Sequence, residues 1–224
     1  IHDVVFDIGG GGTNGKPVKA VQTGGPSGGC LPVSKFDLPM DFDALYEAGS
    51  MIGSGGMVVM DEGTCMVDVA KYFLKFLQDE SCGKCVPCRL GIDRMLEIIT
   101  DFSEGRGTLE QIDLLEELSD TVSQTALCGL GKTAANPVRS TLKYFREEYE
   151  AHINHKKCPA GVCQSLITYA IDPEQCTFCG VCKNACPHDA ITGEKKQVHE
   201  IQLDICQKCG ICRSDCKFDA ITVI

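Results

Sequence analysis

The feature that most constrains the fold of this chain is a cysteine-rich segment that occurs twice, with a period of 30 residues. Residues 176–192 read CTFCGVCKNACPHDAIT, and residues 206–222 read CQKCGICRSDCKFDAIT. All four cysteines, one glycine and the DAIT tail recur at the same offset. Two copies of so small a unit must pack on each other to bury their apolar sides. We therefore expect one compact domain built from the two copies.

Cysteine is unusually common in this chain, with 16 among 224 residues. Most of these cysteines lie in tight clusters with two residues between neighbours. This spacing suits shared metal ligation far better than disulfide pairing. We therefore expect metal–thiolate sites and a reducing, cytoplasmic compartment.

Within each copy the spacing is Cys-x2-Cys-x2-Cys-x3-Cys, which is typical of bacterial ferredoxins with two [4Fe–4S] clusters. Three cysteines within seven residues can wrap one loop around a cluster, and the fourth ligates the other cluster. We predict that one cluster is held by Cys176, Cys179, Cys182 and Cys216, and the second by Cys186, Cys206, Cys209 and Cys212. In this pattern a proline follows the fourth cysteine. Pro187 fits the pattern in the first copy, whereas Lys217 stands at the equivalent position of the second copy and departs from it. Paired zinc sites are the alternative, but zinc prefers separated CxxC pairs.

A second cysteine motif, ESCGKCVPCRLG at residues 80–91, supplies three thiols and no fourth nearby. Pro87 suits the first turn of a helix, which puts Cys88 where the positive end of the helix dipole can face an anionic cluster. The fourth ligand must come from another segment, and LCGLGK offers Cys128 beside glycines that allow close approach. We predict a third [4Fe–4S] cluster on Cys82, Cys85, Cys88 and Cys128; a zinc ion on the same thiolates is the alternative.

The stretch HINHKKCPAGVC, residues 152–163, combines two histidines with two of the four cysteines that the clusters leave over. Histidine and thiolates at such spacing suit zinc. We predict a zinc site that fastens the joint between two domains, formed by Cys158, Cys163 and His155, with Cys65 as fourth ligand ahead of His152. As lone thiols, Cys30 and Cys65 are otherwise expected to be small buried residues.

The rest of the chain divides by composition and periodicity. Residues 1–61 are rich in glycine and contain three strand-like runs, DVVFDI, VKAVQT and GMVVM, with GGGGTNG predicted as a hairpin loop. The segment DFDALYEAG predicts a short helix with Asp41 as its N-cap. Residues 64–156 carry apolar side chains at helical spacing, a capping box in TLEQ and a helix start at Asn136 and Pro137. Four such helices with short connections predict a small antiparallel bundle.

Several of these motifs together resemble a known family. ESCGKCVPCRLG, followed by CGLGKTAANPV, looks like the cluster-binding helical domain of the NADH-oxidising flavoprotein subunit of respiratory complex I. GGPSGG and GSGGMVVMDE resemble the β-grasp, soluble-ligand-binding domain of the same subunits. The two-cluster segment at the end of the chain is similar to the tail of the β subunit of trimeric electron-bifurcating [FeFe]-hydrogenases and NADP-reducing hydrogenases.

The resemblance implies an α+β multidomain fold. It predicts a β-grasp domain over residues 1–62, truncated at its N-terminus, and a helical [4Fe–4S] bundle over residues 63–156. A linker with the zinc site spans residues 157–165, and a two-cluster ferredoxin domain spans residues 166–224. It also implies that FMN and the NAD(H) site lie in an upstream domain outside this chain. The partners that it implies are a hydrogenase catalytic subunit, a small [2Fe–2S] subunit and a ferredoxin.

The bulk charge is compatible with this interpretation. The net charge is −10, which argues against a nucleic-acid or anionic-membrane partner. No apolar run approaches the roughly 20 residues of a membrane span, and no nucleophile, general base or phosphate loop indicates bond-making chemistry. We predict an electron relay in an NAD(P)-linked oxidoreductase. Two alternatives are the equivalent subunit of an NAD(P)-dependent formate dehydrogenase and a zinc-binding assembly module without a redox role.

Overall fold

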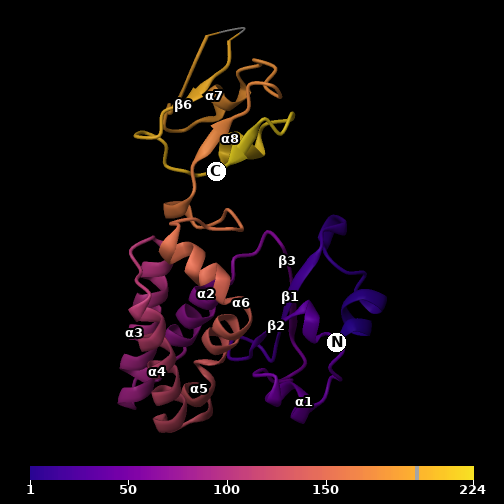
Figure 1. The fold of residues 1–224 in the computed structure, drawn as a ribbon, viewed down its shortest axis with the longest axis vertical. Helices are drawn as coiled ribbons and strands as arrows, with labels where there is room; N and C mark the ends of the chain where they lie inside the picture. The colour runs from indigo at the N-terminus through magenta and orange to yellow at the C-terminus, as the bar shows by residue number, and fades with distance from the viewer. Residues whose placement is uncertain (195–196) are drawn as a thin grey trace. The chain divides into compact units, whose positions relative to one another are not determined.

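The computed structural model describes residues 1–194 and 197–224. The chain forms two compact units, Ile1–Cys163 and Gln164–Ile224 (Figure 1). No helix among the described residues is both long and apolar enough to cross a membrane.

The first unit begins with a small antiparallel sheet of strand order β2-β1-β3. Its strands are β1 (Val18–Thr23), β2 (Cys30–Pro32) and β3 (Met57–Asp61), and Val21 of the central strand lies opposite Leu31 and Val59. Two short 3-10 turns, η2 (Thr13–Gly15) and η3 (Val33–Lys35), flank β1 and β2. The runs VKAVQT and GMVVM are therefore strands, as the sequence predicts.

Helix α1 (Phe42–Glu47) lies between β2 and β3 in the sequence. It begins at the predicted N-cap, because the Asp41 carboxylate accepts a hydrogen bond of 2.8 Å from the Ala44 N–H. Its buried residue Leu45 packs with Val21, Leu31 and Phe36 in the core under the sheet.

The run DVVFDI was predicted as a strand, and this prediction is wrong. It forms a π-type helix, η1 (Asp3–Ile8), in which the Val5 N–H donates to the Ile1 carbonyl and only Val5 is buried. A short apolar run does not distinguish helix from strand by periodicity alone. The glycines that follow do not join two strands, so GGGGTNG is not the predicted hairpin loop.

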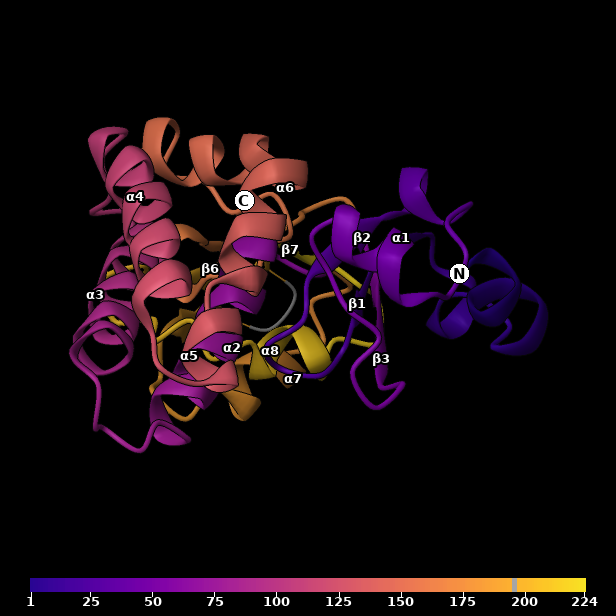
Figure 2. The same cartoon turned by 90° about the horizontal axis from the view of Figure 1, so that it is seen from below.

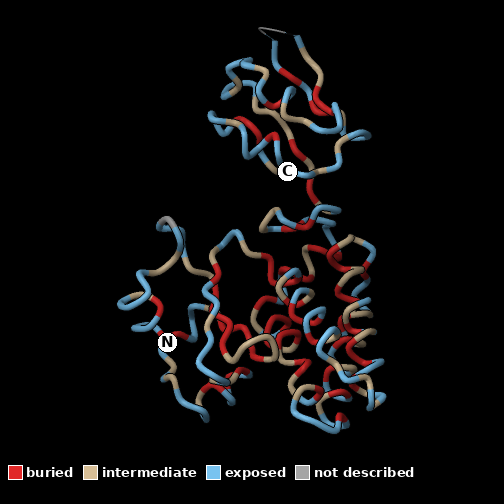
Figure 3. Tube along the Cα trace, turned by 180° about the vertical axis from the view of Figure 1, so that it is seen from behind, coloured by how far each residue is buried: buried red, intermediate tan, exposed pale blue. Residues whose placement is uncertain are grey.

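Five helices follow the sheet: α2 (Met66–Asp79), α3 (Val86–Ser103), α4 (Glu110–Thr125), α5 (Gly129–Thr133) and α6 (Asn136–Asn154). Helix α2 contacts α3 and α6, and α3 contacts α4, so that the four long helices lie side by side (Figure 2). Buried residues gather along the facing sides of these helices (Figure 3). The rings of Phe102 and Tyr149, 5.9 Å apart and nearly perpendicular, join α3 to α6 in this core.

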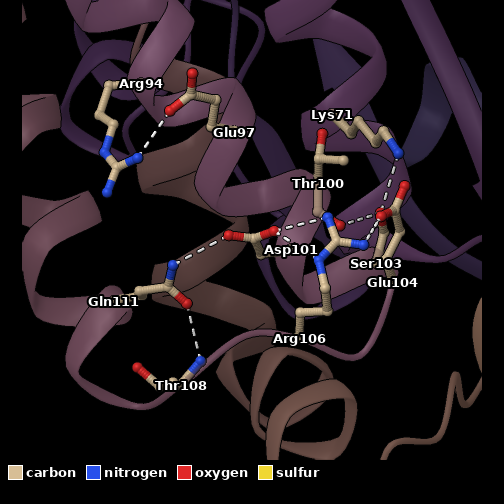
Figure 4. Close-up of polar contacts among 10 residues, drawn as sticks. All are labelled: Lys71, Arg94, Glu97, Thr100, Asp101, Ser103, Glu104, Arg106, Thr108 and Gln111. Atoms are coloured by element: carbon tan, nitrogen blue, oxygen red, sulfur yellow. Dashed lines mark hydrogen bonds and ion pairs between the residues drawn. The ribbon is translucent and has the colours of Figure 1, made fainter.

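The turn between α3 and α4 is held by side chains (Figure 4). Arg106 pairs with Asp101 at 2.8 Å and also with Glu104. The Gln111 side chain accepts a hydrogen bond of 2.9 Å from the Thr108 N–H, which is the backward hydrogen bond of the capping box predicted in TLEQ.

Helix α6 connects the sheet to the other helices. It contacts β2 as well as α2, α3 and α4. Its backbone leaves helical geometry at Phe145, with φ −137° and ψ 34°, and this side chain packs against Ala20, Cys30 and Met60 of the strands. The helix starts at Asn136, one residue earlier than predicted, with Pro137 in its first turn.

The second unit repeats one arrangement twice. Strand β4 (Tyr169–Ile171) pairs with β7 (Ile221–Val223), and β5 (Ile191–Thr192) pairs with β6 (Glu200–Ile201). Ile171 lies opposite Ile221 in one ladder, and Ile201 lies opposite Ile191 in the other. The two pairs are equivalent, because each residue of one pair has its counterpart 30 positions away in the other pair. The two copies are therefore related by a pseudo-two-fold axis. The short helices α7 (Val181–Ala185) and α8 (Ile211–Ser214) and the 3-10 turn η4 (Gln164–Leu166) complete this unit.

Candidate metal centres

The first candidate centre lies at the start of α3. Cys85 is the N-cap of this helix and Cys88 lies in its first turn, with Pro87 at the start as the sequence predicts. Cys128 is the N-cap of α5. Burial raises the pKa of the Cys88 thiol, and the neighbouring charges of Cys85, Cys128 and Cys82 raise it further. The four thiols predicted to share a cluster are therefore close enough to influence one another.

The loop before α5 contributes more than its cysteine. The Leu127 N–H donates a hydrogen bond to the Cys85 thiolate, which lowers the pKa of this exposed thiol. The Ser81 hydroxyl lies 3.3 Å from the Cys88 sulfur. Backbone and hydroxyl donors of this kind stabilise the negative charge that iron–sulfur ligation puts on the sulfur atoms.

The second and third candidate centres are two cavities in the second unit. Cys176, Cys179 and Cys182 line one cavity together with Cys216 from the other copy. The second cavity is lined by Cys186, Cys206, Cys209 and Cys212. The structure thus gathers the cysteines into the two predicted sets, each with its fourth cysteine from the other copy.

The loops around these cavities require glycine at one position each. Gly180 has φ +76° and Gly210 has φ +78°, in the left-handed region that glycine adopts without strain. Burial raises the pKa of Cys212 to about 11, and it also raises the pKa of Cys182. Buried thiols of this kind are neutral unless a bound cation compensates the charge of the thiolate.

The donor sets fit a cluster rather than a single ion. Ligand sulfurs of one zinc ion lie at most about 4.6 Å apart, because each Zn–S bond is about 2.3 Å. The cysteines of the three cluster sets are not among the described groups whose ligand atoms all come within 4.8 Å of one another. Sets of four thiols that lie farther apart than a single ion allows suit the larger [4Fe–4S] core, and the two sets of the second unit also surround a cavity.

One group of residues does meet the single-ion criterion with thiol and imidazole donors. Cys65, His152, Cys158 and Cys163 are all buried, and their ligand atoms lie within 4.8 Å of one another. The Cys65 sulfur lies 3.5 Å from His152 Nε2 and 3.8 Å from the Cys163 sulfur. His152 Nδ1 lies 2.7 Å from the Glu148 carbonyl, which accepts a hydrogen bond from the Nδ1–H and leaves Nε2 directed at the thiols.

The prediction for this group is corrected at one position. His155, preferred from its spacing to Cys158, is exposed at the C-cap of α6 and lies outside the group. His152 takes its place, because α6 is still helical there and residue 152 follows Tyr149 on the same buried face. The stripe of Val138, Leu142, Phe145 and Tyr149 that predicts α6 continues to position 152, so the signal was present in the sequence.

The four side chains influence one another strongly. Hydrogen bonds to the Cys158 thiolate raise the pKa of Cys163 to about 12, and hydrogen bonds from Cys163 and Cys65 lower the pKa of Cys158. Burial opposes protonation of His152, but hydrogen bonds to Cys158 and Cys65 outweigh it and raise its pKa to about 10.

A buried ion pair supports the position of Cys65. Lys19 of β1 lies 2.5 Å from one carboxylate oxygen of Glu148 and donates a hydrogen bond of 2.6 Å to the Thr64 carbonyl. The second oxygen of Glu148 accepts a hydrogen bond from the Met66 N–H at 3.0 Å. The backbone on both sides of Cys65 is therefore fixed by one network. A second candidate group, His2, Asp3 and Asp7, is fully exposed and has no such support.

Comparisons with known proteins agree with these centres. Residues 68–152 match the NADH-ubiquinone oxidoreductase-F iron-sulfur binding region, and residues 169–192 match the 4Fe-4S binding domain. The fold and the cysteine sites thus define an iron–sulfur electron-transfer protein.

Among curated proteins, the chain is 54% identical over 199 residues to NADP-reducing hydrogenase subunit HndC of Solidesulfovibrio fructosivorans, which covers 89% of this chain and 41% of the relative. It is 41% identical over 159 residues to the NADH-quinone oxidoreductase subunit named F 2 of Rhizobium meliloti (strain 1021), covering 71% of this chain and 38% of the relative. The chain spans about two fifths of the length of these relatives.

Among solved structures, the NAD+-reducing [NiFe]-hydrogenase in the H2-reduced state superposes with a TM-score of 0.56 at 29% identity. The match covers 62% of this chain and 24% of that chain. The chain is thus a homologue of part of these hydrogenase and NADH-quinone oxidoreductase subunits, including their iron–sulfur binding region, which confirms the family resemblance predicted from its motifs.

Gly131 provides a test of the centre at α3. A Cβ atom at Gly131 would lie 2.6 Å from the Ala126 Cβ and 3.2 Å from the Cys88 Cβ. We expect Gly131→Ala to displace α5 and to remove about one cluster, or about four irons, from the protein. Colorimetric iron analysis measures this loss. Gly129→Ala is the matched control, because a Cβ there meets nothing within 4 Å; equal iron in the two variants would contradict the packing described.

Proposed function

We propose that this chain relays electrons through three [4Fe–4S] clusters inside an NAD(P)-linked oxidoreductase complex. The observation that carries the proposal is the pair of cavities in the second unit, each lined by four cysteines with one from the other copy. When bound, such clusters accept and release single electrons at potentials between about −700 and +450 mV. The chain's own residues hold the clusters by thiolates, orient hydrogen-bond donors toward the sulfurs and limit access of water.

The proposed domain organisation follows the units and the helices. Residues 1–62 would form the β-grasp domain of the soluble-ligand-binding type, which the three-stranded sheet with α1 supports. Residues 63–156 would form the helical bundle around the first cluster, and residues 166–224 the two-cluster ferredoxin domain. Residues 157–165 would be the linker between them. The six cavity-lining cysteines of α7, α8 and their preceding loops would supply three thiolates to each ferredoxin cluster.

The redox partners of the relay follow from the relatives. One relative is named as a subunit of an NADP-reducing hydrogenase, and a structural neighbour is an NAD+-reducing hydrogenase. We infer that FMN and NAD(H) bind to a part of the protein outside this chain. Electrons would pass between that flavin and a hydrogenase catalytic subunit, with a small [2Fe–2S] subunit and a ferredoxin as further partners in an electron-bifurcating complex. The many unpaired thiols support a reducing, cytoplasmic location.

We further propose that Cys65, His152, Cys158 and Cys163 bind a structural Zn²⁺ ion. Three thiols and one imidazole are a common closed zinc set, and all four residues are buried, which leaves no open position for a substrate or a catalytic water. The ion would tie the start of α2 and the end of α6 to the segment that leads to Gln164. Its role is to hold this segment, with no part in electron transfer.

The relay is tested by a redox titration of the intact protein followed by EPR spectroscopy. The expected result is three reducible [4Fe–4S] signals from this chain, assigned by replacing Cys85, Cys179 or Cys209 with serine one at a time. Each replacement should remove or alter one signal and leave the other two. A colourless protein without a signal after dithionite would contradict the relay and favour a zinc-only assembly module.

The zinc site is tested by exchanging the two histidines. We expect His152→Ala to lower zinc affinity by more than the 10–100-fold that loss of a supporting residue typically costs. His155→Ala is the matched control and should retain zinc, because this side chain is exposed outside the group. Lys19→Met, which removes the ion pair with Glu148 and the hydrogen bond to the Thr64 carbonyl but none of the four ligands, should lie between the two. Competition with a chromophoric chelator measures all three; equal affinities for the two histidine variants would exclude the proposed ligand set.

A further inference from the structure

The two cavities of the second unit are copies that differ in one buried ring. All but one residue of each lining has a counterpart in the other at an offset of 30 residues, including the cysteines, Gly180 with Gly210, and Ile171 with Ile201. Each cavity also receives a ring from the opposite copy. His199 lines the cavity of Cys176, and Tyr169, its counterpart, lines the cavity of Cys206.

The His199 ring is enclosed and lacks a polar contact. The residue is 4% exposed, and its ring carbons lie 3.1–3.2 Å from the position of a Cβ on Gly193. Its Nε2 lies 3.8 Å from the corresponding position on Gly180, the glycine of the cluster loop. Within residues 1–194 and 197–224, His199 Nδ1 is the only buried side-chain nitrogen or oxygen without a hydrogen-bond partner.

A buried polar atom in a native protein nearly always has a partner, so this one requires an explanation. The cavity that His199 lines is also the place where four thiols converge. Cluster and cysteine sulfurs are hydrogen-bond acceptors, and donors directed at them raise the reduction potential because they stabilise the added negative charge. The ring nitrogen that lies nearest the cluster loop is Nε2, 3.8 Å from the Cβ position of Gly180. A neutral ring that carries its proton on Nε2 would therefore direct this donor at a bound cluster.

We infer that the imidazole of His199 donates a hydrogen bond to the cluster held by Cys176, Cys179, Cys182 and Cys216, and that this hydrogen bond raises the reduction potential of that cluster. The inference rests on the ferredoxin clusters of the proposed function. The step is a one-electron reduction in which no atom is exchanged, and the electron comes from the reduced donor of the complex. His199 is a positioning residue, since it acts on the electron only through its hydrogen bond to the cluster.

Tyr169 lines the second cavity, and its hydroxyl lies 3.0 Å from the position of a Cβ on Gly210. The two cavities therefore present different donors to their clusters, an imidazole at the first and a phenol at the second. At a second pair of equivalent positions the histidine belongs to the other cavity. Phe218 lines the first cavity and its counterpart His188 lines the second, but His188 is exposed.

The test uses the intact, cluster-loaded protein and two readouts. In an EPR-monitored redox titration, His199→Leu should lower the equilibrium constant for reduction of one cluster by about tenfold, which is 59 mV for one electron. His199→Gln keeps an N–H donor and should retain the wild-type value within about twofold. His155→Leu is the matched control and should shift neither cluster, because this exposed histidine lies at the C-cap of α6 and lines neither cavity. An equal shift in His155→Leu, or none in His199→Leu, would overturn the inference.

The second readout detects the contact itself. With 15N-labelled histidine, pulsed EPR of the reduced wild-type protein should show a nitrogen coupling to one cluster, and this coupling should vanish in His199→Gln. The wild-type measurement decides the question even if His199→Leu fails to assemble. If both ferredoxin clusters are present but neither shows this nitrogen coupling, the role of His199 is refuted while the proposed clusters stand. Fewer than about eight irons in the cysteine-rich unit would instead refute the proposed clusters.

Discussion

The fold of this chain depends on one constraint: cysteine thiols from separate segments must meet at the same metal site. Cys128 must reach the loop of Cys82, Cys85 and Cys88, which fixes the turn before α5 against the start of α3. In the second unit each copy supplies one cysteine to the other cavity, so neither copy can complete a site alone. The glycines at these points have positive φ angles or close neighbours because the backbone must approach the sulfurs.

The group of Cys65, His152, Cys158 and Cys163 is a smaller site under the same constraint, since its ligand atoms also come from separate segments. Lys19, Glu148 and the backbone beside Cys65 form one network, and it links the sheet to α2 and α6. Desolvation of a buried ion pair offsets most of its Coulomb attraction, so its net contribution to the free energy of folding is small. Its effect is geometric, because it fixes the position of one thiol and, through the Glu148 carbonyl, the orientation of the His152 ring.

Ligand spacing is a local property of the chain, so the sequence alone suggests the cysteine sets. The structure places the cysteines of each predicted ferredoxin set around one cavity. The sequence predicted α2, α3, α4 and α6 for a similar reason, since apolar residues at helical spacing must share a buried face. It did not predict η1, because an isolated apolar run has no periodicity to separate helix from strand. The sequence favoured His155 over His152 because it is closer to Cys158 along the chain. In the structure, the side of helix α6 on which each histidine lies decides the outcome, and only His152 lies on the buried side. The contacts of Lys19 and the enclosed ring of His199 arise from residues distant in sequence, and spacing carries no signal for them.

The central claim is that this chain contains three cluster sites of four thiolates and one closed site of three thiolates and an imidazole. Metal analysis of the protein purified without oxygen tests it most directly. We predict about twelve irons and about one zinc for each copy of this chain, after subtraction of any metal bound by other parts of the protein. A content of only about eight irons would contradict the predicted cluster at α3. A content of about twelve irons without zinc would contradict the metal site around His152.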